Sequence, residues 1–222
     1  MKTSIKFGYS FIEDLKFVRN FVSKSYTRPI LTGFTVGIKE GKVTISATDS
    51  YKLIDVIIGE IEDKETIYQS KSFPAEIIDF VVKIMKKAKS CIFSIDTDND
   101  RVSFSESESA PEYSVTALQG VFPNIENLFK GIEQKVSIKK EWYQEFVYKY
   151  TGWDLHPTLE IDIKGAPELM YFQRENFDFI FKHFKGSKGE IFHANSVVKS
   201  ILLTFDFNWK YRIVILPVRV GD

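Results

Sequence analysis

The chain has 222 residues, of which 44% are hydrophobic and 27% charged, so we expect one or two globular domains with a hydrophobic core. Lys plus Arg and Asp plus Glu number 30 each, so DNA binding would need locally clustered cations rather than bulk charge. The single Cys91 excludes an internal disulfide and fits a reducing compartment. Because there is neither an apolar signal segment nor a run of about 18 apolar residues, we expect a cytoplasmic protein without a membrane span.

Residues 28–53 predict antiparallel strands around a tight turn, two before the turn and one after it. Apolar residues alternate with mostly polar ones, which is typical of half-buried strands. Between the runs, Glu40-Gly41 supplies a residue that tolerates positive φ, as a hairpin requires. The alternating apolar positions are Phe34, Val36, Ile38, Val43 and Ile45. The flanking segments RPILTG and ATDSYKL are more particular than a hairpin demands.

An internal repeat covers residues 1 to about 128. Residues 34–46 align with residues 93–105, apolar position on apolar position. A helical pattern precedes each copy, at about 11–23 and about 74–87, and an alternating strand follows each, Lys52–Glu60 and 113–118. Pro74 suits a first helical turn. The order β-α-β-β-β therefore occurs twice.

The turn formers of residues 122–131 break the pattern, and the remaining residues hold no clean second repeat. Residues 176–184 fit the periods of both a short helix and a strand. The other predicted elements of this part are strands at 136–138, 158–164, 168–173, 190–193, 200–207 and 211–220 and a helix at 139–150.

The duplicated halves, together with RPILTG, ATDSYKL, GVFPN and the terminal ILPVRV, resemble the bacterial sliding clamp family, the β subunit of DNA polymerase III. The resemblance implies an α+β DNA clamp fold with helices lining a ring and antiparallel sheets outside. It implies a domain similar to the family's middle domain at 1–128 and a shortened one similar to the C-terminal domain at 129–222. The match across 131–210 is weak.

The family carries three such domains per chain and closes as a dimer of six. If six domains are still the product, three copies of this chain must supply them, as in two-domain archaeal, eukaryotic and phage clamps. The resemblance therefore implies a homo-trimer that closes head to tail through sheet edges.

The resemblance implies that the protein is not an enzyme. It would be a processivity factor that encircles double-stranded DNA without sequence preference and tethers the polymerase. The helices would turn positive charge toward phosphate, in contacts that weaken steeply with salt. The candidate DNA-facing residues are Lys16, Arg19, Lys24, Lys83, Lys86, Lys87, Lys139, Lys140 and Lys149. Each lysine is also compatible with an ordinary solvated helix face.

The resemblance further implies a groove between the two domains that receives short, partly hydrophobic peptides of polymerases and clamp loaders. The matching positions are Leu31, Thr48, Ser50, Tyr51, Lys52, Leu53, Leu216, Pro217, Val218 and Arg219, with Phe129 at a pocket proline. Ser50, Tyr51 and Lys52 replace a usual glycine, histidine and arginine, so the groove is expected to accept a different motif. Leu53, Leu216 and Pro217 are also compatible with ordinary strand core.

Other chemistries fit less well. Asp96, Asp98 and Asp100 resemble a calcium loop, but Arg101 and Ser107 occupy its glycine and glutamate positions, so an acidic hairpin turn is expected. His156, His183, His193 and Cys91 lack metal spacing. Asp49-Ser50 lacks the glycine elbow of a hydrolase. Because none of these patterns is complete, we expect neither a metal nor a cofactor. Two alternatives stay open: a clamp-derived decoy that binds replication proteins without encircling DNA, and an unrelated duplicated α+β enzyme.

Overall fold

The computed structural model describes residues 2–8, 10–85, 88, 90–129, 134–137, 158–161, 170–184, 189–193, 201–205 and 210–217. The chain forms two compact units. The first unit comprises residues 1–50 and 54–123, and the second comprises residues 51–53 and 124–222. Within the described residues, no helix has the length and hydropathy needed to cross a membrane.

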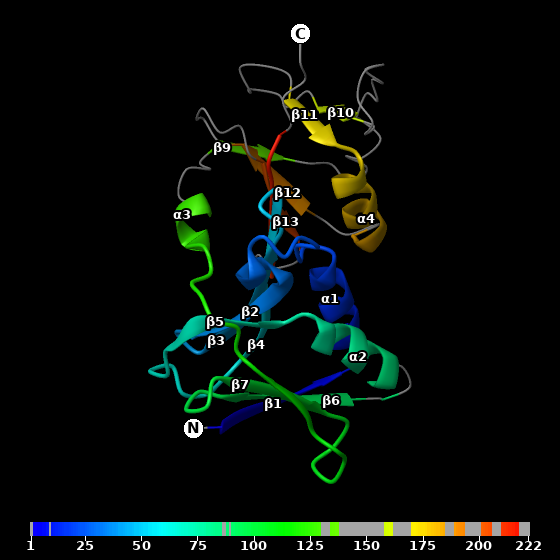
Figure 1. Cartoon of the computed structure of the whole chain (residues 1–222). Helices are drawn as coiled ribbons and strands as arrows, with labels where there is room; N and C mark the ends of the chain where they lie inside the picture. Colours follow the sequence, from blue (N-terminus) through cyan, green and yellow to red (C-terminus); the bar gives the residue numbers. More distant parts are fainter. Residues whose placement is uncertain are drawn as a thin grey trace. The chain divides into compact units, whose positions relative to one another are not determined.

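The first unit contains the β-α-β-β-β order twice, which confirms the predicted duplication (Figure 1). A 3-10 helix, η1, interrupts the first copy between α1 and β2. The first copy is β1 (Lys2–Gly8), α1 (Ser10–Arg19), η1 (Pro29–Thr32), β2 (Gly33–Lys39), β3 (Lys42–Thr48) and β4 (Lys52–Glu60). The second is β5 (Tyr68–Pro74), α2 (Glu76–Ile84), β6 (Ser90–Asp96), β7 (Arg101–Ser105) and β8 (Tyr113–Thr116).

Each sheet of the first unit combines strands from both copies. One sheet has the order β1-β6-β7-β8 and the other β5-β2-β3-β4. The first sheet is antiparallel throughout, with Phe93 opposite both Ile5 and Phe104. The helices α1 and α2 lie side by side (Figure 1), and α1 contacts β1 in one sheet and β3 in the other. The apolar face of α1 thus joins the two sheets.

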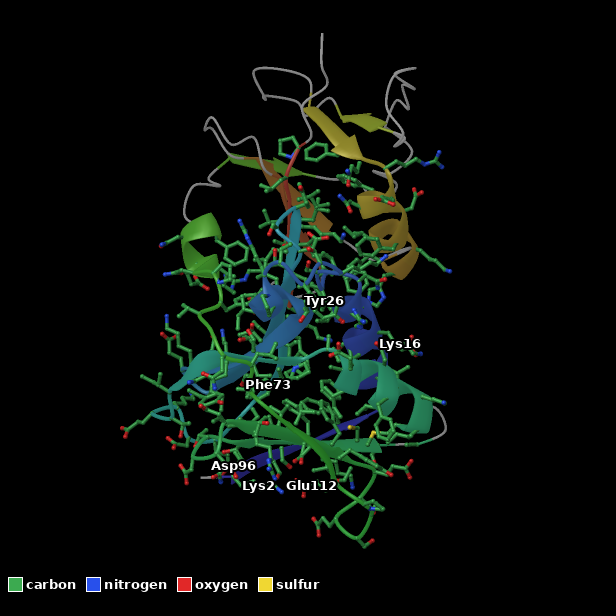
Figure 2. The ribbon with its side chains drawn as sticks, viewed as in Figure 1. Lys2, Lys16, Tyr26, Phe73, Asp96 and Glu112 are labelled. Atoms are coloured by element: carbon green, nitrogen blue, oxygen red, sulfur yellow. The ribbon has the colours of Figure 1, made fainter. Side chains whose placement is uncertain are left out.

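That packing explains the helical periodicity in the sequence. Phe11, Leu15 and Val18 are buried on α1, and Ile78 and Val81 on α2. Aromatic rings continue this core into the sheets, since Phe11 lies against Phe93 and Phe93 against Phe104, and Phe73 of β5 is fully buried (Figure 2). Because aromatic rings bury large apolar areas, this phenylalanine-rich core accounts for much of the first unit's stability.

The hairpin between β2 and β3 has the predicted turn. Glu40 and Gly41 have φ of 52° and 75°, both in the left-handed region that a two-residue hairpin loop requires. A Cβ on Gly41 would lie 3.0 Å from the carbonyl oxygen of Ile61, so this site is crowded as well. Local backbone geometry therefore sets the register that pairs Lys39 with Lys42.

The segment before β2 corrects the prediction. Residues 29–32 form η1, a 3-10 helix, rather than a strand. Pro29 has a fixed φ that suits a first helical position, Leu31 N–H donates to the Arg28 carbonyl, and Thr32 Oγ1 donates to the Pro29 carbonyl. The glycine of RPILTG begins β2, where a Cβ on Gly33 would lie 2.3 Å from the Phe73 carbonyl oxygen. Close backbone approach, not turn formation, requires this glycine.

The strands of this hairpin are also more deeply buried than predicted. The half-buried pattern predicts Thr35 and Ser46 on the exposed face, yet both are buried, as are Ser72 and Asp55 on the neighbouring strands. Thr35 Oγ1 lies 2.9 Å from Ser72 Oγ, and Ser46 Oγ donates to an Asp55 carboxylate oxygen at 2.6 Å. Small hydroxyl groups on adjacent strands satisfy one another, so these polar positions are buried without orphaned donors.

Both helices of the first unit are shorter than their apolar pattern. The Asn20 side-chain amide donates to the carbonyls of Lys16 and Phe17, and this local bonding ends α1 at Arg19. Pro74 is the last residue of β5 and not the first turn of a helix, as the sequence had suggested. A proline lacks the N–H that a continuing ladder would use, so it suits a strand end.

In the second unit, β14, β13, β12 and β9 are neighbours in that order, and β10 pairs with β11. The ambiguous segment 176–184 is helical, since Phe177, Ile180 and Phe184 are buried at helical spacing. The predicted helix 139–150 lies outside the described residues. The elements are α3 (Ile125–Phe129), β9 (Gln134–Ser137), β10 (Thr158–Ile161), β11 (Met170–Gln173), α4 (Glu175–His183), β12 (Gly189–His193), β13 (Ile201–Phe205) and β14 (Tyr211–Ile215).

Candidate functional site

The second unit brings two distant parts of the predicted groove together. The start of β4 lies next to β14, and the Leu216 N–H donates to the Tyr51 carbonyl at 2.8 Å. Tyr51 is 63% exposed, whereas Leu216 and Pro217 are half-buried. The backbone thus joins a residue with an exposed aromatic ring to half-buried apolar residues, which is the composition of a surface that can receive an apolar peptide side chain. Val218 and Arg219 lie outside the described residues.

Leu53 occupies the interior beneath this surface. It is buried and forms a cluster with buried Val214, onto which Ile125 and Phe129 of α3 pack; we call these four residues the Leu53 cluster. Because Leu53 is only 2% exposed, its contribution is to packing rather than to direct contact with a ligand. Phe129, predicted to line the groove, is the partner of Leu53 in this cluster.

Arg212 of β14 fixes α3 over the cluster. Its guanidinium lies 4.0 Å from the centre of the Phe129 ring, a cation–π geometry, and its Nη2 is 3.0 Å from a Glu126 carboxylate oxygen. One arginine thus holds two residues of a short helix that has little intrinsic stability. Arg212, Val214 and Ile125 were not among the predicted site residues, although the apolar alternation in 211–215 indicates that Val214 is a strand residue.

Lys52 lies near an aromatic ring of the same unit. Its Nζ is 6.0 Å from the centre of the Phe179 ring on α4, at the outer limit of a cation–π contact. Phe179 and Lys52 are both half-buried. Lys52 directly follows Tyr51 in the chain and thus adds a half-buried basic residue to this part of the second unit.

Three predicted groove residues belong to the first unit. Leu31 and Thr48 are buried, and Ser50 is exposed. The Ser50 N–H donates to Thr48 Oγ1 at 3.1 Å, and Ser50 has a φ of 82°. This left-handed backbone explains why a glycine suits the position and why a serine here is strained. Arg28, which sequence reasoning did not select, donates from Nη1 to Ser50 Oγ at 3.4 Å.

A second candidate site is the charged surface of α1 and α2. Its members are at least partly exposed, and we call it the helix face; they are Glu13, Lys16, Arg19, Glu76, Asp79 and Lys83. Lys16 projects from α1 (Figure 2) and pairs with Glu13, while Arg19 pairs with Asp79. Three acidic and three basic side chains make this face neutral, so it is less positive than the lysine pattern suggested.

The remaining predicted DNA-facing residues divide into two groups. Lys24 and Lys83 are exposed and make no ion pair within the part of the chain that the structure describes. Lys86, Lys87, Lys139, Lys140 and Lys149 lie outside the described residues. Among the predicted DNA-facing residues that the structure describes, Lys24 and Lys83 therefore lack an ion pair, whereas Lys16 and Arg19 of α1 each have one.

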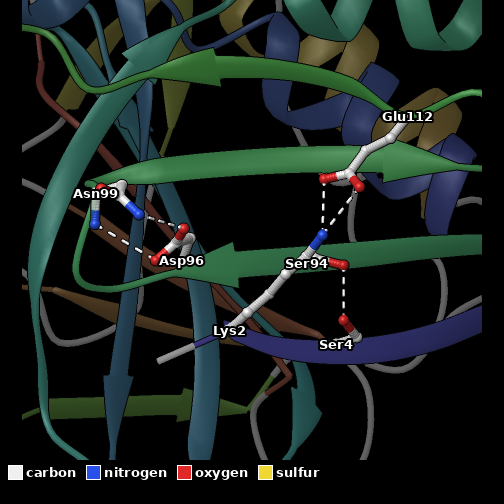
Figure 3. A network of polar contacts seen from close by, with 6 residues as sticks. All are labelled: Lys2, Ser4, Ser94, Asp96, Asn99 and Glu112. Atoms are coloured by element: carbon white, nitrogen blue, oxygen red, sulfur yellow. Dashed lines mark hydrogen bonds and ion pairs between the residues drawn. The ribbon is translucent and has the colours of Figure 1, made fainter.

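The acidic hairpin between β6 and β7 is a closed hydrogen-bonded turn. Asp96 accepts hydrogen bonds from the Asn99 side chain and from the backbone N–H of Asp98 and Asn99, and the Asn99 bond chiefly lowers the Asp96 pKa (Figure 3). Asp100 pairs with Lys71 at 3.1 Å and accepts from the Tyr68 hydroxyl. Among the described residues, no group of three or more acidic, histidine or cysteine side chains could hold a metal.

Two further groups have structural explanations. Lys2 Nζ donates to both carboxylate oxygens of Glu112, at 2.8 and 2.9 Å, and this hydrogen bonding lowers the Glu112 pKa (Figure 3). Burial raises the pKa of the Cys91 thiol to about 12, so it stays protonated and is a poor nucleophile.

Solved structures define the class of fold. The chain is similar over 99% of its length to sliding clamps from Bacillus subtilis (TM-score 0.74, 15% identity) and Caulobacter crescentus (TM-score 0.75, 16% identity). A sliding clamp from Pseudomonas aeruginosa bound to griselimycin is similar with a TM-score of 0.72 and 12% identity, again over 99% of the chain. The chain covers 65%, 66% and 66% of these proteins, respectively. The predicted clamp fold is therefore confirmed.

The sequence comparison defines the family. The family model described as the DNA polymerase III beta subunit, central domain, matches residues 10–124, just over half of the chain. The chain belongs to the DNA polymerase III beta subunit family. No curated protein matches its sequence.

Proposed function

We propose that this protein is a sliding clamp that encircles duplex DNA and tethers replication proteins, without catalysing a reaction itself. Membership of the beta subunit family carries the proposal, because the match over residues 10–124 spans the duplicated first unit except for β1. The fold similarity, which extends over 99% of the chain, supports it.

The charge distribution suits such a sleeve. Helices of the ring would face phosphate, which is contacted through charge and carries no sequence information. The neutral helix face, which includes exposed Lys83, together with exposed Lys24 after α1, would hold DNA weakly. Weak, sequence-blind contacts permit sliding, because no position along the duplex is preferred.

The proposed ring is a homo-trimer closed head to tail. Among the strands that the structure describes, β8 is the last of its sheet, and Phe80 of α2, 44% exposed, lies against Tyr113 of this strand with ring centres 5.0 Å apart. An open strand edge beside an exposed aromatic ring is suited to pairing with another strand. Three copies of a chain with two units would supply six. Light scattering should give three times the chain mass of 25.7 kDa, and a monomer at high concentration would contradict the trimer.

Encirclement can be tested without a clamp loader. Linear duplex is incubated with the protein, its ends are then blocked with biotin and streptavidin, and retention is measured in about 0.5 M salt. A ring that has threaded onto DNA stays on the blocked duplex and slides off an unblocked control, because salt screens phosphate contacts but leaves topology intact. Equal loss from both would contradict a clamp and favour a decoy that binds replication proteins without encircling DNA.

We propose the surface around Tyr51, Lys52, Leu216 and Pro217 as the site for partner peptides, with Leu53 and Phe129 packed beneath it. The other predicted members, Leu31, Thr48, Ser50, Val218 and Arg219, stay predictions from the family resemblance. The proposal rests on the hydrogen bond that joins Tyr51 to Leu216, on the exposure of Tyr51 and on the half-buried apolar character of Leu216 and Pro217.

Griselimycin, which a similar clamp binds, is a suitable probe for this surface. Calorimetry should show binding to the wild type, and Tyr51→Ala should weaken it about five- to ten-fold, as expected for an aromatic contact. Tyr26→Ala is the matched control, since Tyr26 is an exposed tyrosine of the first unit (74% exposed, Figure 2). Equal weakening in both variants, or none in either, would contradict the assignment.

A further inference from the structure

Arg19 and Asp79 form a two-pronged ion pair between α1 and α2. Arg19 Nε donates to both carboxylate oxygens of Asp79 at 3.1 Å, and Nη2 donates to Asp79 Oδ2 at 3.0 Å. The planar guanidinium fork matches a carboxylate in this geometry, which a lysine could not reproduce. The two residues lie 60 positions apart, so only the packing of the two helices brings them together.

This ion pair changes what the helix face can offer to a phosphate. The pair with Asp79 uses the Nε donor and one Nη2 donor of Arg19 and compensates its positive charge, so a phosphate gains less from this arginine than from an unpaired cation. If Arg19 were to turn to DNA, Asp79, which is 57% exposed at its side chain, would be left unpaired close to the negatively charged backbone. Both the bonding and the repulsion therefore disfavour a contact between Arg19 and DNA.

Lys24 and Lys83, two other predicted DNA-facing cations of the first unit, differ from Arg19 in their surroundings. Lys24 follows α1 and Lys83 lies in the last turn of α2, and both are exposed without an ion pair among the described residues. Their charges remain available to phosphate. The first unit thus contains cations that form ion pairs with carboxylates and, among the described residues, cations that do not.

We propose that Asp79 lowers the affinity for DNA by holding Arg19 in an ion pair, so that Lys24 and Lys83 make the phosphate contacts of the first unit. This inference rests on the proposed clamp function. It assigns Asp79 as a positioning residue that weakens binding and thereby favours sliding, and it removes Arg19 from the DNA-contacting set.

The test measures binding of a fluorescent 30-base-pair duplex by anisotropy between about 50 and 200 mM salt. Asp79→Asn should tighten binding about three- to ten-fold at the lower salt, because Arg19 gains a phosphate contact. The slope of log affinity against log salt should steepen by about 0.9, the value for one added contact. Asp98→Asn, which removes an exposed carboxylate at the acidic hairpin, is the control for net charge and should change affinity less than two-fold.

A double-mutant cycle isolates the role of Arg19. Arg19→Gln alone should leave affinity within two-fold of wild type, whereas Arg19→Gln in the Asp79→Asn background should abolish the gain. Equal tightening by Asp79→Asn and Asp98→Asn would overturn the inference, because general charge would then explain the effect. Equal weakening by Arg19→Gln in both backgrounds would also overturn it. If wild type binds no duplex at any salt, the clamp function itself fails, and thermal unfolding checks that each variant is folded.

Discussion

The helix face of the first unit and the Leu53 cluster of the second unit are both built from helices beside a sheet, yet they rely on different forces. The helix face holds three acidic and three basic side chains that stay at least partly exposed, so each interaction is screened and individually small. The Leu53 cluster buries its central residues almost completely and adds a cation–π contact. Exposed charge suits the proposed weak contact with DNA, and buried apolar contact suits the packing of α3 onto the sheet.

The largest expected effect is at Leu53. Leu53→Ala should destabilise the protein by about 2–5 kcal/mol, because a buried leucine leaves a cavity beneath Ile125 and Phe129. Urea unfolding measures this change. Tyr51→Ala, two residues earlier but 63% exposed, should change stability by no more than about 0.5 kcal/mol. A small effect of Leu53→Ala would contradict the packing role of the cluster.

On the helix face, an intermediate effect is expected from neutralising the unpaired cations. The double change Lys24→Gln and Lys83→Gln should weaken duplex binding about ten-fold at about 50 mM salt. The slope of log affinity against log salt should become shallower by about 1.8, the value for two lost phosphate contacts. Stability should hardly change, since both side chains are exposed. Lys42→Gln with Lys64→Gln, two exposed lysines of the β2–β3 hairpin and the loop after β4, is the control. Anisotropy showing equal losses for both pairs would mean that position does not matter.

The smallest expected effect is a pH dependence at the Lys2–Glu112 pair. Hydrogen bonding from Lys2 lowers the pKa of Glu112 below its ordinary value of 4.5, so the folded state gains stability above that value and loses it as pH falls through the lowered pKa. Because the pair is about half exposed, the gain is below about 1 kcal/mol.

Thermal unfolding between pH 3 and 7 tests that pair. Glu112→Gln should be slightly less stable than wild type at pH 7, and this difference should shrink as pH falls through the lowered pKa, where the carboxyl becomes protonated in the folded chain as well. Glu108→Gln, at an exposed glutamate of the neighbouring loop, should match wild type throughout. A difference for Glu112→Gln that stays constant with pH would show that charge is not its origin.

Local sequence anticipated much of the first unit. The alignment of residues 34–46 with 93–105 predicted both hairpins, and Glu40-Gly41 marked the positive φ of the first turn. These features depend on short-range sterics and on side chains that alternate across a sheet, so they can be predicted from a single sequence. Helix ends were less accurate, because the Asn20 cap and the role of Pro74 depend on local hydrogen bonds that compete with the apolar period.

The candidate sites were only partly predictable for the same reason. The family resemblance placed Tyr51 and Leu216 in one surface, and their hydrogen bond brings them together. It missed Val214, Ile125 and Arg212, whose roles come from the docking of α3. It also implied that Arg19 is a DNA-facing cation, because the resemblance does not predict the ion pair between Arg19 and Asp79.

The sequence by itself determined the duplicated β-α-β-β-β order, the hairpin turn and the residues that could belong to a clamp. Periodicity and backbone preference act over a few residues, so these properties need no knowledge of distant partners. Only the tertiary structure decided which charged side chains form ion pairs and which apolar residues are buried. Arg19 meets Asp79, and Leu53 meets Phe129, across 60 or more residues of chain. Screening and burial depend on such neighbours in space, which no local pattern specifies.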